Sequence, residues 1–498
     1  MREHRKAALS VVGRADVPLR QPCARPLYVD MDGTLLATDV LWELFVLLVK
    51  TRPVLLLWVP FWLMKGKACL KRHLASRLML NPKLLPYHEP VLAFLTEEYR
   101  DGREIVLATA SDRLVAEPVA HYVGLFSEVL ASDGNVNLAG ATKLSAIVRH
   151  ADGAPFDYIG NSSADLPIWR RAARAILVRP SRRLRAQAER TATVDRVLGP
   201  RPGGWRSVLR TLRVHQWSKN ALVLVPLLLA HRIADPARLL DGVLAFIVFS
   251  LAASGVYIAN DLLDLESDRR HPYKRFRPLA AGAIPIPLAI GLLLVAVPVS
   301  LGIAVALLPG LFTGVLLLYL AASTAYSFGL KRIVIVDVLT LAGLYTLRVL
   351  AGAVATQVAV SPWFLAFSMF FFVSLAFVKR YAELRLGGDE KGTQDYLLAR
   401  GYVAGDAELL RSVGPTSGYL AVAVLALYIN SPEVLMLYSR PTVLWMLGPL
   451  LLYWVTRVWF LAHRGRMQHD PVVWALTDRP SWALAGVVAA LLLVASVG

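Results

Sequence analysis

Cysteine is scarce in this 498-residue sequence, and its scarcity disfavours two classes of protein. The two cysteines, Cys23 and Cys69, match no spacing typical of a zinc site, so neither a disulfide scaffold nor a zinc module is expected. The basic N-terminus also lacks a continuous apolar core ahead of the first strand-like segment. We therefore expect no cleavable secretion signal, and we expect the N-terminal part to stay in the cytoplasm.

Acidic residues are outnumbered, because 36 Asp and Glu against 54 Lys and Arg give a net charge of +18. Such an excess of positive charge is suited to bind nucleic acid, anionic lipid or phosphorylated substrates. The hydrophobic share of 56% and the mean hydropathy of +0.50 indicate a membrane protein. In that setting we interpret the charge as complementary to membrane lipid and phosphate, and we expect no nucleic-acid partner.

Apolar runs of spanning length are missing before about residue 213 and dominate from about residue 219. This difference predicts a soluble α/β domain followed by an all-α membrane domain. The expected parts are a tail over residues 1–25, the α/β domain over 26–200 with a helical cap near 36–100, a basic linker over 201–213 and the membrane domain over 214–498.

The apolar runs predict about nine membrane spans, at residues 219–232, 238–262, 285–307, 309–329, 333–355, 362–380, 415–431, 440–460 and 480–497. Most of the loop Lys and Arg residues lie near 263–284, 330–332, 381–414 and 461–479. The positive-inside rule places these loops in the cytoplasm. We therefore expect a multi-pass protein of a bacterial inner (plasma) membrane.

Three short apolar segments are typical of buried strands, namely residues 26–30, 104–109 and 156–160. Helical stretches separate them, which predicts a parallel sheet in a Rossmann-like α/β domain. All three segments end in polar residues. Since sites in such sheets gather at the carboxyl ends of the strands, these residues are candidates for one site.

The segment 40–65 contains two apolar stretches of about ten residues each, separated by a break at residues 50–53. Each stretch is too short to cross a bilayer at about 1.5 Å per residue. We predict helices of a cap whose apolar side rests on the membrane or on the second domain. A purely internal cap core and a membrane hairpin are the alternatives.

Two carboxylates follow the first predicted strand. Asp30 and Asp32 lie two residues apart, where they can share Mg²⁺ and a phosphoryl group, one attacking phosphorus and the other moving protons. Further candidates lie at the later strands and between them: Thr109 and Lys143 for phosphate, and Asn161 and Asp165 for a metal.

In this order the residues resemble the four motifs of haloacid dehalogenase-like phosphatases, over about residues 26–200. The resemblance implies that Asp30 is the nucleophile that forms an aspartyl-phosphate, and that Asp32 is the acid and base. One departure is Asn161, where the family usually has Asp, because the missing charge weakens Mg²⁺ binding. An amide oxygen still coordinates Mg²⁺, so an active phosphatase and a degenerate structural domain are both open.

An acidic stripe ends the second predicted span. Helical spacing places Asn260, Asp261, Asp264 and Asp268 on one side of a helix. Uncompensated carboxylates beside a membrane repel one another, and Mg²⁺ carrying a diphosphate would neutralise them. A solvated helix end is the alternative.

This stripe resembles the first Asp-rich motif of the UbiA superfamily of intramembrane prenyltransferases, whose members bind a diphosphate through Mg²⁺. Lys331 lies where that superfamily has a diphosphate-binding basic residue, with an interface anchor as the alternative role. The second Asp-rich motif of aromatic prenyltransferases is replaced by residues 379–385, which hold three cations and one acid. An acidic and a basic cluster together suit a metal-bound diphosphate facing an additional phosphate.

Residues 216–220, 260–278, 348–356 and 379–384 resemble the decaprenyl-phosphate phosphoribosyltransferase branch of that superfamily. Its members move phosphoribose from phosphoribosyl pyrophosphate to a polyprenyl phosphate. For Arg348 the alternative is a structural ion pair. A positive-inside role is the alternative for the basic residues expected at the cytoplasmic rim of the site, namely Lys219, Lys274, Arg275 and Arg277. The substrate-binding candidates in this part are Lys219, Asn260, Lys274, Arg275, Arg277, Tyr326, Lys331, Arg348, Lys379, Arg380, Tyr381, Glu383 and Arg385.

We hypothesise a bifunctional enzyme with Mg²⁺ as cofactor. Its membrane domain would transfer 5-phosphoribose from phosphoribosyl pyrophosphate to polyprenyl phosphate, and its soluble domain would remove the 5-phosphate. One alternative is an aromatic prenyltransferase that uses polyprenyl diphosphate and carries an unrelated phosphatase-like domain. Another is a soluble domain that is catalytically silent and serves for docking. The sequence leaves a homo-oligomer open.

Overall fold

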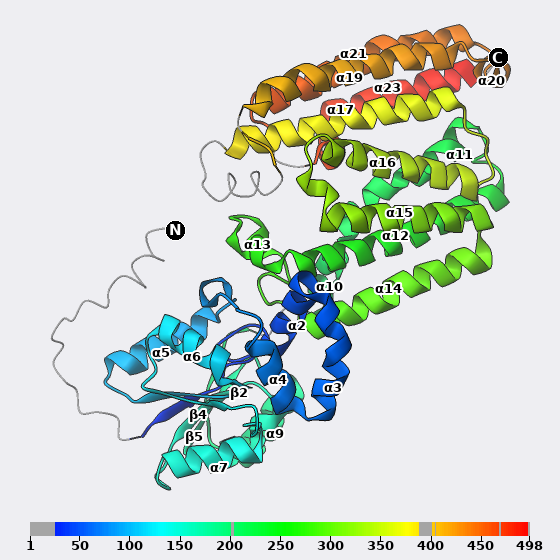
Figure 1. Ribbon diagram of the computed structural model, residues 1–498. Coiled ribbons are helices and arrows are strands. Elements are labelled where there is room, and N and C mark those ends of the chain that lie inside the picture. Colours follow the sequence, from blue (N-terminus) through cyan, green and yellow to red (C-terminus); the bar gives the residue numbers. More distant parts are fainter. Residues whose placement is uncertain (1–24, 201–203, 388–400, 404, 468–469, 497–498) are drawn as a thin grey trace. The chain divides into compact units, whose positions relative to one another are not determined.

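The computed structural model describes residues 25–200, 204–387, 401–403, 405–467 and 470–496 (Figure 1). The expected tail over residues 1–25 lies almost entirely outside the described residues. The chain divides into two compact units. One comprises Met1–Gly203 and Ala281–Ile286, and the other comprises Gly204–Ala280 and Pro287–Gly498. We call them the α/β unit and the membrane unit.

The α/β unit is built on a six-stranded sheet in which every pair of neighbours is parallel. The predicted strands are confirmed as β1, β2 and β4, and these three lie side by side at the centre of the sheet. The order is β3-β2-β1-β4-β5-β6, with bounds Leu27–Val29 (β1), Ile105–Asp112 (β2), Glu128–Ser132 (β3), Asp157–Gly160 (β4), Arg174–Val178 (β5) and Val194–Leu198 (β6).

Both faces of this sheet are covered, as expected for parallel strands joined by helical crossovers. Along β1, Leu27 and Val29 enter the core under one set of helices, and Tyr28 between them enters the core on the other face. The first face is covered by the cap and by α5 (Glu89–Arg100) and α6 (Arg113–Val123). The second face is covered by α7 (Ala141–His150), α8 (Leu166–Arg171) and α9 (Arg182–Thr191) (Figure 1).

The predicted cap helices are confirmed. They are α2 (Val40–Thr51), η1 (Pro53–Trp58), α3 (Val59–Met64) and α4 (Lys67–Ala75). The first helix begins at Asp39, whose side chain accepts from the backbone N–H groups of the next turn. Pro53 ends it, because proline does not fit the interior of a helix. The turn into α4 uses Gly66 at a φ of +106°, which a residue with a Cβ rarely adopts.

The membrane unit contains eight helices that are long and apolar enough to cross a membrane, counted over the described ranges. Helix α21 is preceded by η7 (Pro441–Met446), with which it forms one span. The helices are α12 (Pro236–Leu263), α14 (Ile286–Leu307), α15 (Gly310–Phe328), α16 (Val336–Ala355), α17 (Pro362–Gly387), α19 (Asp406–Ile429), α21 (Leu447–His463) and α23 (Arg479–Ser496).

The prediction of about nine spans is therefore one too high. The segment predicted as the first span, 219–232, lies in the 3₁₀-helix η4 (Val214–Leu224) and in α11 (Val225–Leu229), which has only five residues. Pro226 stands in the first turn of α11, where its missing N–H costs nothing and where proline favours the start of a helix. The segment is apolar enough for a membrane but forms no long α-helix.

The 3₁₀-helix η4 packs closely on α16. A Cβ added to Gly352 of α16 would lie 1.8 Å from the backbone oxygen of Val223, so this approach requires glycine. The larger apolar cores of the unit lie between α16, α17, α19 and α21 and between α12, α15 and α16. A smaller core joins α19 to η7 and α23.

Short elements connect the spans. They are α13 (Leu265–Arg270), η5 (Lys274–Phe276), η6 (Leu330–Arg332), α20 (Pro432–Leu437) and α22 (Pro471–Ala475). Helix α10 (Gly204–Thr211) lies within the segment expected to be a basic linker, and residues 201–203 lie outside the described residues.

Candidate functional sites

Asp30 and Asp32 lie directly after β1, at the carboxyl edge of the sheet. Asp30 is buried, and its Oδ1 accepts from the backbone N–H of Met31 at 2.9 Å and from Lys143 Nζ at 2.8 Å. The structure thus joins two predicted residues, Asp30 and Lys143, that are 113 positions apart. A buried ammonium group beside a carboxylate is suited to hold a dianionic phosphoryl group there.

Asp32 accepts two hydrogen bonds, from the backbone N–H of Val40 at 2.8 Å and from Ser111 Oγ at 2.6 Å. Burial raises the pKa of Asp32 to about 7, and the charge of Asp39 adds to the shift. Burial also raises the pKa of Asp30, to about 6, although Lys143 opposes the shift. Two neighbouring carboxyls with different pKa values near neutrality can divide the roles of nucleophile and proton donor.

Asp165 organises the loop after β4. Its Oδ1 accepts from the Tyr158 hydroxyl at 2.8 Å, and its Oδ2 accepts from the backbone N–H groups of Asn161 at 3.1 Å and Ser162 at 3.0 Å. Tyr158 also accepts from Lys143 at 3.1 Å. Protein donors occupy both oxygens of Asp165, so this side chain fixes the loop and, through Tyr158, the lysine, while its role at a metal stays a prediction.

Asn161 presents its side-chain amide to the loop after β1. Its Oδ1 accepts from Thr34 Oγ1 at 3.3 Å. A Cβ at Gly33, where φ is +72°, would lie 2.1 Å from Asn161 Nδ2. Gly33 therefore makes the space that brings the amide close to the carboxylate loop.

Thr109 is fully buried, and its Oγ1 accepts from the backbone N–H of Ser111 at 3.0 Å. Our sequence reasoning missed Ser111, which contacts Asp32. The period of two along a strand was an available signal, since residues 109 and 111 lie on the same side of β2. Lys71 of the cap was not predicted from the sequence either. Its Nζ donates to the backbone oxygen of Ala110 at 2.6 Å.

The predicted acidic stripe in the membrane unit lies at the end of α12 and in α13, with Asn260 in the last turn of α12. Asp261 is paired with Arg213, and its Oδ1 lies 3.1 Å from Arg277 Nη1. The same Nη1 atom lies 2.6 Å from Asp268 Oδ2. Two carboxylates therefore face one point, which a guanidinium nitrogen occupies.

Asp264 faces a different cation. Lys331 Nζ lies 2.9 Å from Asp264 Oδ2 and 3.1 Å from Oδ1, so two predicted residues meet across 67 positions. Each aspartate of the stripe thus has a basic partner. No group of three or more His, Cys, Asp or Glu side chains arranged to hold a metal is found in the part of the chain that the structure describes.

A cationic cluster lies near α22. Lys219 Nζ lies 2.8 Å and Lys379 Nζ 3.5 Å from Asp470 Oδ2, and the Tyr345 hydroxyl donates to the same carboxylate at 3.2 Å. Although burial alone would raise it, the two lysines hold the pKa of Asp470 well below its usual range. Asp470 was missed from the sequence because it stands alone, without a motif.

Arg348 extends this cluster. Its Nε donates to Asn220 Oδ1 at 2.8 Å, and its guanidinium lies 5.6 Å, 5.0 Å and 5.3 Å from the ring centres of Phe249, Tyr319 and Tyr345. Among the residues that the structure describes, no carboxylate forms an ion pair with Arg348, whose charge is stabilised by the rings and the amide. The structural ion pair considered for Arg348 is thus not what holds it here.

Family models match both units. The haloacid dehalogenase-like hydrolase family matches residues 27–170, and the UbiA prenyltransferase family matches residues 221–477. The chain belongs to the UbiA prenyltransferase family. Its N-terminal domain is haloacid dehalogenase-like, and the chain is a multi-pass membrane enzyme of the UbiA type.

Three curated relatives are similar to this chain over different shares of its length. Uncharacterized protein y4nM of Sinorhizobium fredii is 37% identical over 94% of this chain and 91% of its own length. Nodulation protein NoeC of Azorhizobium caulinodans is 37% identical over 54% of this chain and 86% of its length. Decaprenyl-phosphate phosphoribosyltransferase of Mycobacterium tuberculosis is 44% identical over 36% of this chain and 60% of that enzyme.

The UbiA unit can accommodate the magnesium ions expected from its sequence. The stripe supplies hard carboxylate oxygens, the ligands that Mg²⁺ prefers, and two of them already converge on a cationic nitrogen. A metal at that point would displace Arg277. The ligand set thus fits, provided that the basic partners move to other acceptors.

A third group of predicted residues in the UbiA unit forms a network of hydrogen bonds and ion pairs among its own members. Arg380 is fully buried, is paired with Asp337 and Glu383, and donates to the Tyr326 hydroxyl at 2.9 Å. Tyr326 in turn donates to Asp337 at 2.7 Å. Sequence reasoning missed Asp337, whose burial in α16 fixes this network between α15, α16 and α17.

The remaining candidates lie at the rim. Tyr381 is hydrogen-bonded to His463 Nδ1 at 2.8 Å, and Arg385 donates to the His463 backbone oxygen at 3.1 Å. Lys274 and Arg275 lie in η5, close to the acidic stripe in sequence, and the guanidinium of Arg275 lies 4.7 Å from the Phe276 ring centre. The structure leaves Arg275 exposed.

Proposed function

We propose that this chain is a bifunctional enzyme that makes a polyprenyl phosphoryl ribose. The UbiA unit would transfer 5-phosphoribose from phosphoribosyl pyrophosphate to a polyprenyl phosphate, and the α/β unit would then remove the 5-phosphate. The observation that carries this proposal is the pairing of an acidic stripe with a separate cluster of buried cations in one membrane unit. Two phosphate-bearing substrates need both, whereas an aromatic acceptor needs only the first.

In the transfer step an oxygen of the lipid phosphate forms a bond to the anomeric carbon of the sugar, and pyrophosphate leaves. Asp261, Asp264 and Asp268 would hold Mg²⁺, which neutralises the charge that grows on the leaving group. Arg277 and Lys331, released from these carboxylates, would bind phosphate oxygens. Arg277 and Lys331 would thus neutralise the acidic stripe before the substrate binds and the substrate phosphates afterwards.

The lipid phosphate needs its own cations. Lys219 and Lys379 meet on one side of Asp470, and Arg348 lies against Tyr345 of the same group. A phosphate that replaced the Asp470 carboxylate would meet two ammonium groups already arranged around one acceptor. We therefore assign this cluster to the head group of the polyprenyl phosphate.

In the second step Asp30 Oδ would attack the 5-phosphate, and the ribose 5-oxygen would leave with a proton from Asp32. Lys143 lies 2.8 Å from Asp30 and would neutralise the transferred phosphoryl group. Water, activated by the now ionised Asp32, would release phosphate. Asp30, Asp32 and the Asn161 amide would hold Mg²⁺, which neutralises charge on the phosphoryl oxygens.

The decisive experiment uses the full-length protein with phosphoribosyl pyrophosphate, polyprenyl phosphate and Mg²⁺, followed by mass analysis of the lipid. We expect a ribosyl lipid from the wild type and a phosphoribosyl lipid from Asp30→Asn. A phosphoribosyl lipid from both proteins would show that the α/β unit is silent towards this product. Unchanged polyprenyl phosphate would overturn the transfer and favour an aromatic prenyltransferase.

A further inference from the structure

The cap of the α/β unit carries an apolar surface. In the segment of η1 and α3, six large apolar side chains are exposed by between 51% and 84%: Val54, Leu57, Trp58, Phe61, Leu63 and Met64. We call these six residues the cap patch. Single exposed apolar residues are ordinary on protein surfaces, but six within eleven positions indicate an interaction site.

The same segment is also apolar on its inner side. Leu55, Leu56, Val59 and Trp62 pack against the core of the α/β unit. Trp62 stacks on His73 of α4, with ring centres 5.0 Å apart, and the guanidinium of Arg77 lies 5.2 Å from the Trp62 ring centre. The inner side thus explains how the cap is held, and the cap patch is left without a role in the fold. A helix that is apolar all round requires a second apolar surface.

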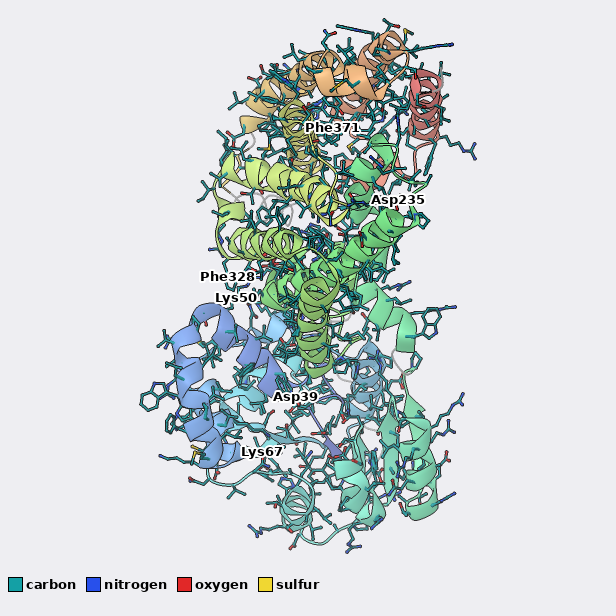
Figure 2. All side chains as sticks on the ribbon, turned by 90° about the vertical axis from the view of Figure 1, so that its right-hand side faces the viewer. Asp39, Lys50, Lys67, Asp235, Phe328 and Phe371 are labelled. Atoms are coloured by element: carbon teal, nitrogen blue, oxygen red, sulfur yellow. The ribbon has the colours of Figure 1, made fainter. Side chains whose placement is uncertain are left out.

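The charges around the cap patch indicate which kind of surface the patch contacts. Lys50, Arg52, Lys65 and Lys67 flank the patch and are all exposed. Figure 2 labels Lys50 and Lys67, which lie at opposite ends of the cap segment. The sequence between Glu43 and Glu89 contains no Asp or Glu, although it holds eight Lys and Arg residues.

We propose that the cap patch inserts into the anionic leaflet of the bilayer in which the membrane unit lies. An apolar face with an aromatic residue and a one-sided basic rim is the pattern of segments that lie in the interface of a membrane. The segment Pro53–Met64 has 12 residues, too few to span. The basic rim favours anionic lipid over a second copy of this chain, whose own patch carries the same positive charge.

The docking would have a consequence for catalysis. The cap patch and Lys71 belong to the same helical hairpin, and Lys71 reaches the carboxyl edge of the sheet, where it donates to Ala110 O and to Asn137 Oδ1. Lys71 would therefore meet a phosphate group presented from the lipid side. The docking itself goes beyond the proposed function and does not depend on it. Only the role of Lys71 towards a phosphate rests on the proposed function.

The test measures the depth of the cap in the full-length protein, reconstituted in nanodiscs with anionic lipid. In a chain with Cys23→Ser and Cys69→Ser, a nitroxide is attached at Met64→Cys in the cap patch or at Tyr99→Cys in α5. Tyr99 is a matched control because it is exposed and belongs to α5, a helix that lies away from α3 in the same unit (Figure 1). We expect the nitroxide at 64 to be relaxed mainly by oxygen, and the nitroxide at 99 mainly by a water-soluble nickel chelate.

Two outcomes would overturn the docking. Equal access of the nickel chelate to both positions would show that the cap patch stays in water. Protection of position 64 from both reagents would show that protein covers it, whether the membrane unit or a second copy. Neither outcome depends on enzymatic activity, so failure of the docking is distinct from failure of the proposed function.

A second measurement uses Trp58→Ser/Phe61→Ser with two substrates. For a phosphorylated lipid in vesicles we expect KM to rise about tenfold, because the cap no longer holds the domain at the surface. For a soluble phosphate monoester we expect a change of less than about twofold, because neither residue contacts the carboxylates. An equal loss on both substrates would indicate damage to the fold and would contradict the proposal, as would no loss on the lipid.

Discussion

The two candidate sites of this enzyme balance charge in opposite ways. In the α/β unit Asp30 is buried and Asp32 half-buried, with one direct cation, Lys143, and the loss of solvation raises the pKa of both carboxyls. In the UbiA unit each aspartate of the stripe is paired with a basic side chain. The difference teaches that the first pair of carboxyls is suited to proton transfer, whereas the second group would have to exchange its ion pairs before it could bind metal and phosphate.

The largest effect is expected from removing the nucleophile. Asp30→Asn should lower phosphate release by about a thousandfold or more, because an amide cannot attack phosphorus, and should leave lipid phosphoribosylation intact. The measurement is phosphate release together with lipid mass analysis. Asp101→Asn, an exposed carboxylate after α5, is the matched control. Loss of both reactions in Asp30→Asn would show that the two sites are not independent.

Removing one acid of the stripe should produce the reverse pattern. Asp261→Asn should lower the transfer by about a hundredfold or more, since one metal ligand is lost and Arg277 keeps only Asp268. Hydrolysis of a soluble phosphate monoester should be unchanged. Glu266→Gln, which only loses a pair with exposed Arg270, is the control in the same segment. Normal transfer in Asp261→Asn would exclude the stripe as the metal site.

The pH dependence should separate the two reactions. Phosphate release should fall about tenfold per unit below pH 6, as Asp30 gains a proton, and likewise above pH 7, as Asp32 loses the proton that it donates. Bound Mg²⁺ favours the ionised carboxylate and would move the lower limb to lower pH. Rates with a soluble monoester between pH 5 and 9 check this, and a flat profile would contradict these roles.

Asp470→Asn should lower the free energy of unfolding by about 3–5 kcal/mol, because Lys219 and Lys379 lose their shared buried carboxylate. Polyprenyl phosphate should restore much of the thermal stability, since its phosphate would replace the missing charge. Thermal unfolding with and without the lipid measures both effects. Asp195→Asn, at a half-exposed surface pair, is the control. Equal stabilisation of wild type and variant by the lipid would argue against phosphate binding at this cluster.

The smallest effect concerns the departure from the phosphatase motif. Asn161→Asp should lower the Mg²⁺ concentration for half-maximal phosphate release by about three- to tenfold, because a formal charge is added beside Asp30. Asn135→Asp is a control, since it adds the same charge at an exposed position of the α/β unit. A Mg²⁺ requirement that does not change would show that residue 161 is not a ligand.

Local patterns allowed much of this architecture to be predicted. The strands β1, β2 and β4 follow from short apolar segments, and most spans follow from long ones, because both signals lie in consecutive residues. The segment 219–232 shows the limit, since hydropathy reports apolarity but does not distinguish a 3₁₀-helix from a long α-helix. The cap helices were predicted for the same reason that the strands were.

Partners that are distant in the sequence could not be predicted. Asp470 meets Lys219 across the unit, and Tyr158 joins Lys143 to Asp165, although none of the five shares a motif with its partner. Such contacts depend on how the elements pack. Helical spacing placed the acidic stripe on one side of a helix, but it gave no indication that Arg213 and Arg277 neutralise it.

Gly352 shows how a residue without a side chain governs chemistry nearby. Arg348 precedes it by one turn of α16, and the partner of Arg348, Asn220, precedes Val223 by three residues of η4. A methyl group at 352 would meet the Val223 carbonyl and separate the two elements. Lys219, next to Asn220, would move with them. The spacing between Lys219 and Arg348 therefore depends on residue 352 having no Cβ atom.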